Sequence, residues 1–191
     1  TAITSQPVGG SRCPGQSITF SVTASGTGPF SYQWRRGGVN LSGATSSSCT
    51  IGSVSAGDAG DYDVEVTGAC GNATSSAATL TVNSPTAITS QPVGGNRCPG
   101  QSITFSVSAG GTGAFGYQWR KGGVNLSGAT SASYTIASVT STDAGDYDVA
   151  VTGACGNATS SAATLTVNST TAIASQPAGG SRRPGQSITF S

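Results

Sequence analysis

The sequence predicts an all-β chain made of small sandwich domains repeated in tandem, and three observations support this prediction. First, the sequence pattern recurs at a fixed interval, because Trp34 and Trp119 are as far apart as Cys70 and Cys155. Second, apolar and polar residues alternate, as they do in strands with one buried face. Third, the chain is rich in Gly, Thr, Val and Ser, and helix signals are few. A repeat of this length suits a complete domain and not a solenoid turn.

The repeat divides the chain into three predicted units. Residues 1–85 form the first unit, residues 86–170 form the second, and residues 171–191 begin a third copy with its first two strands. The third copy stops within the alternating run "SITFS", where no folded domain is expected to end. We therefore expect these residues to belong to a longer array.

Seven strands are expected in each unit, separated by turns rich in Gly, Pro or Asp. In the first unit they are expected at 2–8, 17–24, 30–36, 39–41, 48–54, 61–67 and 74–82. Alternation assigns a set of apolar side chains to the core, and the second unit repeats the pattern. The expected core residues are Ile18, Phe20, Val22, Tyr32, Trp34, Tyr62, Val64, Val66, Tyr117, Trp119, Tyr147, Val149 and Val151.

Two motifs of each unit resemble the immunoglobulin fold: "YQW" in the third strand and "DAGDYDV" before and within the sixth. In that family the Trp packs on a disulfide between the sandwich sheets, and the Tyr forms the tyrosine corner. The positions of that disulfide hold apolar pairs instead, namely Val22 with Val64 and Val107 with Val149. The resemblance therefore implies Greek-key sandwiches arranged like beads on a string, with Trp34, Tyr62, Trp119 and Tyr147 as structural core residues and no core disulfide.

More narrowly, "GVNLSGATSSS", "AGDYDV" and "TGACGN" resemble tandem immunoglobulin-like repeats of bacterial cell-surface and secreted proteins. The resemblance covers the whole chain. It implies a fold more firmly than a function, because such repeats serve as spacers, stalks and adhesive modules.

The topology of such a sandwich predicts a disulfide between domains. Cys13 lies in the turn before the second strand and Cys70 in the hairpin after the sixth, which are opposite ends of one domain. At about 3.3 Å per residue along a strand, they are too far apart to bond. The end of one domain that carries the turn before the second strand meets the end of the next domain that carries the hairpin after the sixth strand. We therefore expect Cys13 to pair with Cys155. The alternative is a bond within one repeat on a rearranged topology.

The other cysteines follow from the same scheme. Cys98 and Cys70 are expected to pair with neighbouring repeats or subunits, and Arg183 takes the matching position in the third copy. Cys49 has no partner in this scheme, and Tyr134 replaces it in the second repeat. We therefore interpret it as a repeat variation and not as an inter-chain link or a reactive thiol.

Neither a metal site nor catalysis is expected. The acidic residues are too dispersed for a calcium loop; Asp58 is expected to order its turn by accepting from backbone N–H groups, and Asp61 or Asp63 to face Arg35 or Gln33. The same interpretation holds for Asp143, Asp146 and Asp148. The chain has no His to act as a general base, and no Ser or Cys has a recognisable activating partner. We therefore predict no cofactor and no enzymatic activity.

The composition also limits the partners. Only 8% of the residues are charged and the net charge is +1, so a nucleic-acid-binding face is not expected. No apolar run approaches the ~20 residues that span a bilayer, and no signal peptide is evident. Covalent glycans are further candidate partners, because the chain is rich in Ser and Thr, whose hydroxyl groups carry O-linked sugars. Five N-x-S/T sequons stand at Asn40, Asn72, Asn125, Asn157 and Asn168.

Together these features predict a structural protein, outside the cell, that forms a fibre or stalk from tandem domains stiffened by short linkers and inter-domain disulfides. Its expected partners are its own neighbouring repeats, and disulfides that persist imply an oxidising compartment. The alternative is an adhesin or an array of carbohydrate-binding accessory modules, with ligands met by the loops around residues 25–29 or by the hairpin at Cys70.

Overall fold

The computed structural model describes residues 1–169, 171–172 and 184–185. Apart from those last four residues, the predicted third copy lies outside the described residues. The described part of the chain contains no helix with the length and apolarity needed to cross a bilayer.

The strands of the two repeats correspond one to one. In the first repeat they are β1 (Ala2–Ser5), β2 (Gly10–Arg12), β3 (Ile18–Ser21), β4 (Thr23–Ser25), β5 (Ser31–Arg36), β6 (Val39–Asn40), β7 (Ser48–Ile51), β8 (Gly60–Gly68), β9 (Gly71–Thr74) and β10 (Ala78–Val82). In the second they are β11 (Ala87–Ser90), β12 (Gly95–Arg97), β13 (Ile103–Ser106), β14 (Ser108–Gly110), β15 (Gly116–Lys121), β16 (Val124–Asn125), β17 (Ser133–Ile136), β18 (Gly145–Gly153), β19 (Gly156–Thr159) and β20 (Ala163–Val167). A short 3-10 turn precedes β8 (Ala56–Asp58) and β18 (Ser141–Asp143).

Each repeat is a two-layer sandwich. One layer has the strand order β2-β10-β8-β5-β6, with β9 also paired to β8, and the other contains the pairs β1-β4 and β3-β7. The second repeat has the same order in strands β11 to β20. The predicted fold class is therefore confirmed: the chain is all-β, with two immunoglobulin-like sandwiches in tandem.

The core lies between the layers, where the alternation places it. Trp34, Val64 and Phe20 are fully buried, and Phe20 stacks on Tyr62 with ring centroids 4.6 Å apart. The Trp34 indole N–H donates to the Ser46 carbonyl at 2.9 Å, so its one polar atom is satisfied. The second core repeats these contacts around Trp119, Phe105 and Tyr147.

The tyrosine corner is present in both repeats. The Tyr62 hydroxyl donates to the Asp58 carbonyl at 2.7 Å, and the Tyr147 hydroxyl donates to the Asp143 carbonyl at 2.8 Å. Val22 and Val64, which occupy the family's disulfide positions, are both buried. An apolar pair therefore stands in the core where the resemblance would place two cysteines.

Three predicted strands are interrupted. The strand predicted at 17–24 becomes β3 and β4, which pair with different strands, β7 and β1. The strand predicted at 2–8 becomes β1 and β2, because Pro7 has no N–H for a ladder and the chain crosses there from one layer to the other. The strand predicted at 74–82 becomes β9 and β10, and the pairing shifts by one residue between Thr74↔Glu65 and Ala78↔Tyr62. Ser75 fills this bulge, since its hydroxyl accepts from the Val64 N–H at 3.0 Å.

Two predicted core residues are less buried than expected. Tyr32 and its counterpart Tyr117 are half-buried and pack against the edge of the core, because they lie near the ends of β5 and β15. The apolar alternation identifies the face of a strand but not how deeply each position lies in the sandwich.

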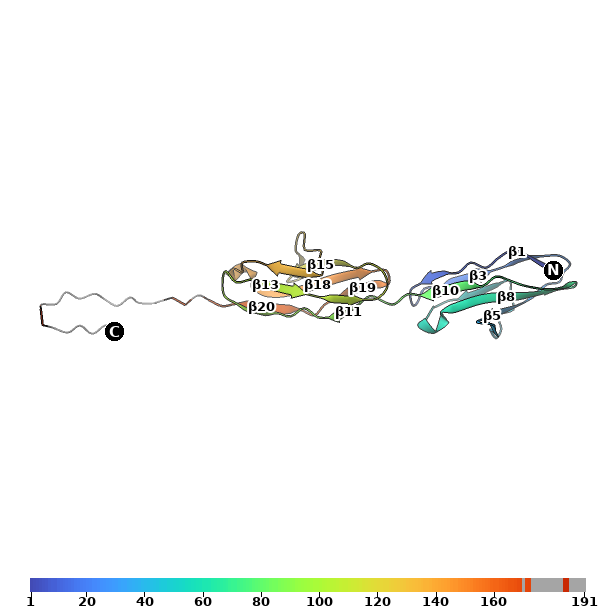
Figure 1. The fold of residues 1–191 in the computed structure, drawn as a ribbon, viewed down its shortest axis with the longest axis horizontal. Coiled ribbons are helices and arrows are strands. Elements are labelled where there is room, and N and C mark those ends of the chain that lie inside the picture. The colour runs from blue at the N-terminus through green and yellow to red at the C-terminus, as the bar shows by residue number, and fades with distance from the viewer. Residues whose placement is uncertain (170, 173–183, 186–191) are drawn as a thin grey trace.

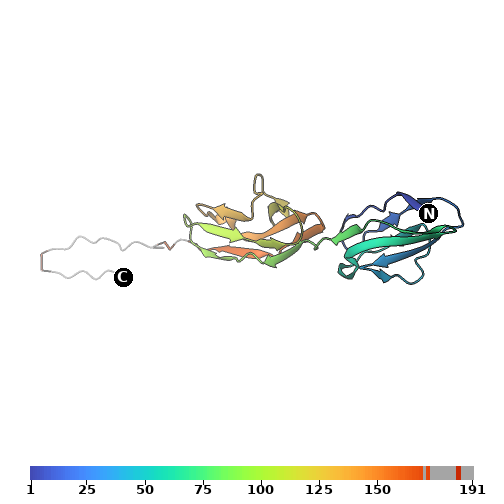
Figure 2. The same ribbon diagram turned by 45° about the vertical axis from the view of Figure 1, so that its right-hand side comes forward.

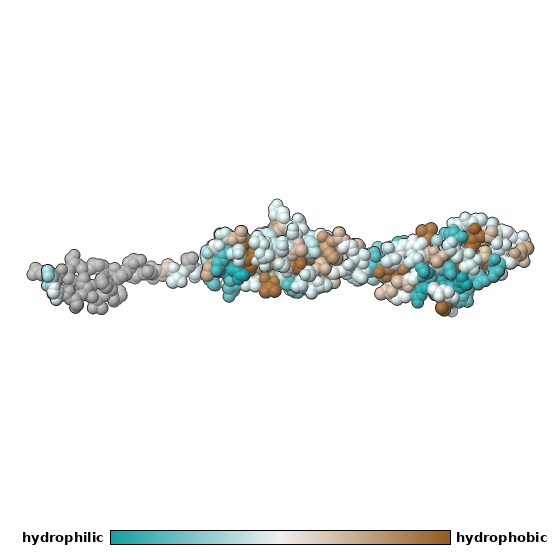
Figure 3. Space-filling view, in the orientation of Figure 1, coloured by the Kyte–Doolittle hydropathy of each residue, from teal (hydrophilic) through white to brown (hydrophobic). Residues whose placement is uncertain are grey.

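The two sandwiches lie end to end. Figure 1 shows the strands of both repeats running roughly along one long axis, with a short connection between them, and Figure 2 shows the same arrangement after rotation. The face drawn in Figure 3 is mostly pale or teal, and its brown apolar patches are small and separate. The region in which the repeats meet determines how the two sandwiches are oriented relative to each other.

Candidate functional site: the junction between the two repeats

A tight turn holds Cys13 at the end of the first repeat that faces the second repeat. It follows β2, where Cys13 N–H donates to the Gln16 side-chain oxygen at 2.8 Å and Gln16 N–H donates to the Cys13 carbonyl at 3.1 Å. Gly15 supplies the left-handed conformation of the turn at φ +84°. Because β2 lies parallel to β10, Cys13 leaves the sandwich beside the linker.

A two-residue hairpin loop holds Cys155 at the end of the second repeat that faces the first repeat. Strands β18 and β19 pair as far as Gly153↔Gly156, which leaves Ala154 and Cys155 at the tip. Gly156 has φ +100°, a conformation that favours glycine in short hairpins. The repeated "TGACGN" motif therefore presents its cysteine at the tip of a short hairpin.

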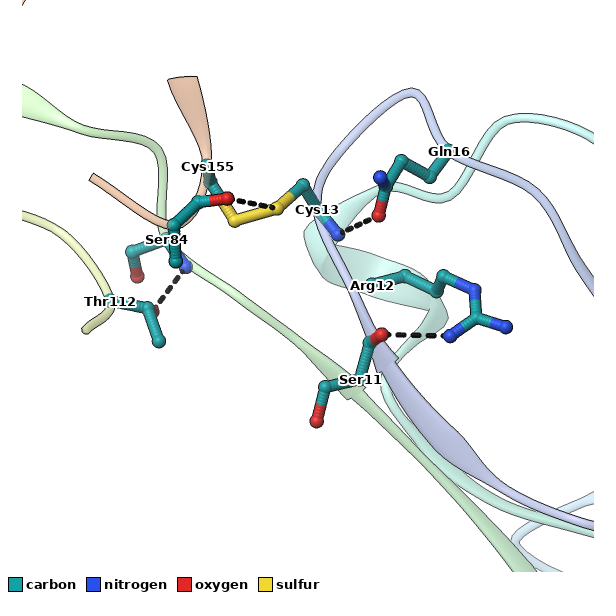
Figure 4. Close-up of a disulfide and its surroundings, with 8 residues drawn as sticks. Ser11, Arg12, Cys13, Gln16, Ser84, Thr112 and Cys155 are labelled. Carbon is teal, nitrogen blue, oxygen red and sulfur yellow. Dashed lines mark hydrogen bonds between the residues drawn. A yellow bond between two sulfur atoms is a disulfide. The ribbon is translucent and has the colours of Figure 1, made fainter. Parts of the chain in front are cut away.

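A disulfide joins these two elements, and it is the pairing that the topology predicted. The Cα atoms of Cys13 and Cys155 are 5.4 Å apart, across a sequence separation of 142 residues. Figure 4 shows the bond crossing from the first repeat to the second beside the linker. Within the described residues the alternative pairing of Cys13 with Cys70 does not occur, since the Cys70 thiol is free.

The linker is bound as well as short. Ser84 N–H donates to the Thr112 hydroxyl at 2.8 Å, and Thr112 N–H donates back to the Ser84 carbonyl at 3.1 Å. Thr86 N–H donates to the Cys155 carbonyl at 3.3 Å. The linker is thus fastened to two loops of the second repeat, one of which also carries the disulfide.

Gly111 makes this close approach feasible. It has φ +129°, and a Cβ at this position would stand 2.6 Å from the Pro85 carbonyl oxygen. The sequence alone did not identify this contact. The signal that would have found it is the "GTG" run common to residues 26–28 and 111–113, which recurs although the residues directly before and after it differ.

The hydrogen bonds that cross the junction join neutral groups. The Arg12 guanidinium, which lies beside Cys13, donates to the Ser11 and Ser17 carbonyls at 2.9 Å each. Neither the disulfide nor the linker contacts depend on an ion pair, so salt should weaken the junction little.

Cysteines outside the junction have two different environments. Cys70 and Cys98 are exposed free thiols at the ends remote from the junction. Cys49 lies half-buried on β7 opposite Phe20, and this burial raises the pKa of its thiol, which disfavours the reactive thiolate. In the second repeat Tyr134 packs at this position against Trp119 and Tyr147.

The acidic residues have structural partners, as interpreted from the sequence. Asp58 accepts from the Ser55 N–H at 2.8 Å and hydroxyl at 2.7 Å, and these bonds hold the pKa of its carboxyl below the usual range. Asp63 accepts from Arg35 at 2.7 Å. Asp61 accepts from the Thr79 hydroxyl at 2.6 Å. Asp143, Asp148 and Asp146 make the matching contacts in the second repeat, and the described residues contain no cluster of three metal-ligating side chains.

Two further predicted features can be located. All five sequon asparagines are exposed, and Asn72 donates to Glu65 at 2.7 Å. Both tryptophans are buried, and the large apolar side chains exposed in the described region are valines, namely Val8, Val39, Val93 and Val124. A shallow hollow of about 360 Å³ lies beside Cys49, lined by residues 41–46 and 48–50. None of these features supplies an aromatic platform for a sugar.

Comparison with known proteins agrees with the fold. Residues 2–82 match the model of the Immunoglobulin I-set domain, a domain type that is typically non-catalytic. No match was found among curated protein sequences.

Several solved structures of tandem immunoglobulin domains are similar. An I-band fragment of titin has a TM-score of 0.74 at 20% identity, over 87% of this chain and 65% of that fragment. Extracellular domains 3–5 of Drosophila OTK have a TM-score of 0.60 at 19% identity, over 88% of this chain and 62% of that one. The first two immunoglobulin domains of DIP-gamma have a TM-score of 0.63 at 12% identity, over 88% and 98%. The chain thus spans less than two thirds of the first two fragments, and at these identities the similarity concerns the fold.

Proposed function

We propose that the chain is a structural element of an extracellular or cell-surface stalk or fibre, in which tandem immunoglobulin-like domains act as a stiff spacer. The observation that carries this proposal is the fastening of the two repeats by the Cys13–Cys155 disulfide together with the bonded linker. A connection at two separate points resists bending far better than a flexible linker alone.

The location outside the cell rests on the same bond. Disulfides persist in oxidising compartments and are rare in the cytosol. The resemblance to bacterial cell-surface repeats and the exposed sequons Asn40, Asn72, Asn125, Asn157 and Asn168 fit a secreted and glycan-bearing protein. The adhesin or carbohydrate-binding alternative has less support, because the aromatic side chains of the described residues lie in or against the cores.

Rotational diffusion tests the spacer role. In the native chain, ¹⁵N relaxation is expected to give both repeats one common, anisotropic tumbling, because the junction makes them one body. In a Cys13→Ser variant, the repeats are expected to tumble with separate and shorter correlation times, since only the linker contacts remain.

Cys70→Ser is the matched control, because it removes an exposed thiol that takes no part in the junction. It should leave the tumbling as in the native chain. Independent tumbling of the repeats in the oxidised native chain would refute the stiff-spacer role. Unchanged tumbling in Cys13→Ser would show that the disulfide is not what stiffens the rod.

A further inference from the structure

The two repeats present unused copies of the junction surfaces at their far ends. The outer end of the first repeat carries the β8–β9 hairpin with Cys70, and that of the second carries the β12–β13 turn with Cys98. Both thiols are exposed, whereas Cys13 and Cys155 are half-buried at their bond. The same sequence elements therefore occur once bonded and once free.

The free turn at Cys98 is built like the bonded turn at Cys13. Cys98 N–H donates to the Gln101 side-chain oxygen at 2.7 Å, as Cys13 N–H does to Gln16 at 2.8 Å. Asn168 N–H donates to the Arg97 carbonyl at 2.9 Å, as Asn83 does to Arg12 at 2.8 Å. Asn168 thus makes the same backbone contact after β20 that Asn83 makes after β10.

The free hairpin at Cys70 is likewise built like the bonded hairpin at Cys155. Strands β8 and β9 pair as far as Gly68↔Gly71, and Gly71 has φ +102°, against +100° for Gly156. Gly26 and Gly111, which precede Thr27 and Thr112, both have a positive φ, at +122° and +129°. Thr27 is exposed, which leaves its N–H and hydroxyl free for the bonds that Thr112 makes to Ser84.

From this correspondence we propose a second interaction surface, which takes a second copy of this chain. The Cys98 turn and Ser169 of one chain dock on the Cys70 hairpin and Thr27 of another, and a Cys98–Cys70 disulfide closes the contact. Because the two surfaces are different, the contact is heterologous and extends head to tail into a filament of chains. This inference rests on the structural role proposed above, to which it adds the partner and the covalent bond.

The bond requires an oxidant. Forming Cys98–Cys70 from two thiols releases two protons and two electrons, which a small-molecule disulfide accepts as it becomes two thiols. The reaction proceeds by exchange, in which one thiolate attacks a mixed disulfide on the other cysteine. The two copies are not joined by a linker. The rate at which the Cys98–Cys70 bond forms should therefore increase with protein concentration.

A pair of complementary variants tests the inference. Cys70→Ser leaves only the Cys98 end able to bond, and Cys98→Ser leaves only the Cys70 end; Cys49→Ala in both removes the remaining thiol. Incubated with glutathione disulfide, each variant alone should stay monomeric. Their mixture should give one covalent dimer, joined through Cys98 of one variant and Cys70 of the other, and the parent chain should give a ladder of multimers on a non-reducing gel.

A third variant tests the docking contact itself. Thr27→Val on the Cys98→Ser chain removes the hydroxyl that would accept from Ser169, and dimer formation should slow about fivefold, as expected for the loss of one hydrogen bond. An equal rate would mean random thiol collision and would overturn the proposed contact. Dimers in the Cys70→Ser sample alone, or none in the mixture, would also overturn it. These failures would leave the spacer role standing, because that role is measured on the single chain.

Discussion

Replacing Trp34 with alanine is expected to destabilise the first repeat strongly and to leave the stability of the second repeat unchanged. Trp34 is fully buried, and its ring lies 6.2 Å from that of Phe20 at the centre of the first core. Truncation of a buried Trp costs about 3–5 kcal/mol. A domain of this size has a total stability of roughly 4–13 kcal/mol, so the loss removes a large share of it.

The two tryptophans make this measurement specific to each repeat. Each repeat has one Trp, so the fluorescence of Trp34→Ala reports on the second repeat alone, while circular dichroism reports on both. We expect a fluorescence transition near its native midpoint and a separate, earlier transition in the dichroism signal. Trp119→Ala is the mirror-image control and should destabilise the second repeat only.

A single coincident transition in Trp34→Ala would contradict this expectation. It would mean that the repeats fold as one cooperative unit, coupled through the junction, and that each core is not sufficient for its own domain.

The second large effect is expected for Gly9→Ala. A Cβ at position 9 would collide with the Thr79 carbonyl and would stand 2.7 Å from its backbone nitrogen. These are backbone atoms of β10, so the clash is relieved only by moving β2 away from its parallel partner. Overpacking of this kind costs about 1–3 kcal/mol or more, so the free energy of unfolding of the first repeat should fall by at least that much.

Gly9→Ala should also weaken the junction, because β2 leads directly to Cys13. Two matched glycine variants separate these effects in denaturant unfolding and free-thiol titration. Gly94→Ala meets the same clash against Thr164 but precedes Cys98, so it should destabilise the second repeat and leave the Cys13–Cys155 bond formed. Gly52→Ala has open space around it and should change little. Equal stability of Gly9→Ala and Gly52→Ala would show that β2 is not held against β10.

Much of this structure follows from the sequence, since the alternation and the fixed repeat locate Trp34, Tyr62 and the core around them. The position of Cys13 relative to Cys155 followed from strand direction alone, because the direction of each strand decides at which end of the sandwich a turn lies. The crossing at Pro7 and the bulge at Ser75 were not predicted, because they depend on which layer each half-strand joins, and a period-two pattern carries no information about that. The hydrogen bonds between Thr112 and Ser84 were not predicted for a related reason. They join two loops, and loops carry no periodic sequence signal.

The Cys13–Cys155 bond itself is tested most directly by a tryptic peptide map of the unreduced chain. Cleavage after Lys and Arg places Cys13 in fragment 13–35, Cys49 and Cys70 in 37–97, Cys98 in 98–120, and Cys155 in 122–182. We expect fragments 13–35 and 122–182 to appear as one linked species that separates on reduction. A linked species of 13–35 with 37–97, or fragment 13–35 free before reduction, would contradict the junction described here and with it the stiff rod.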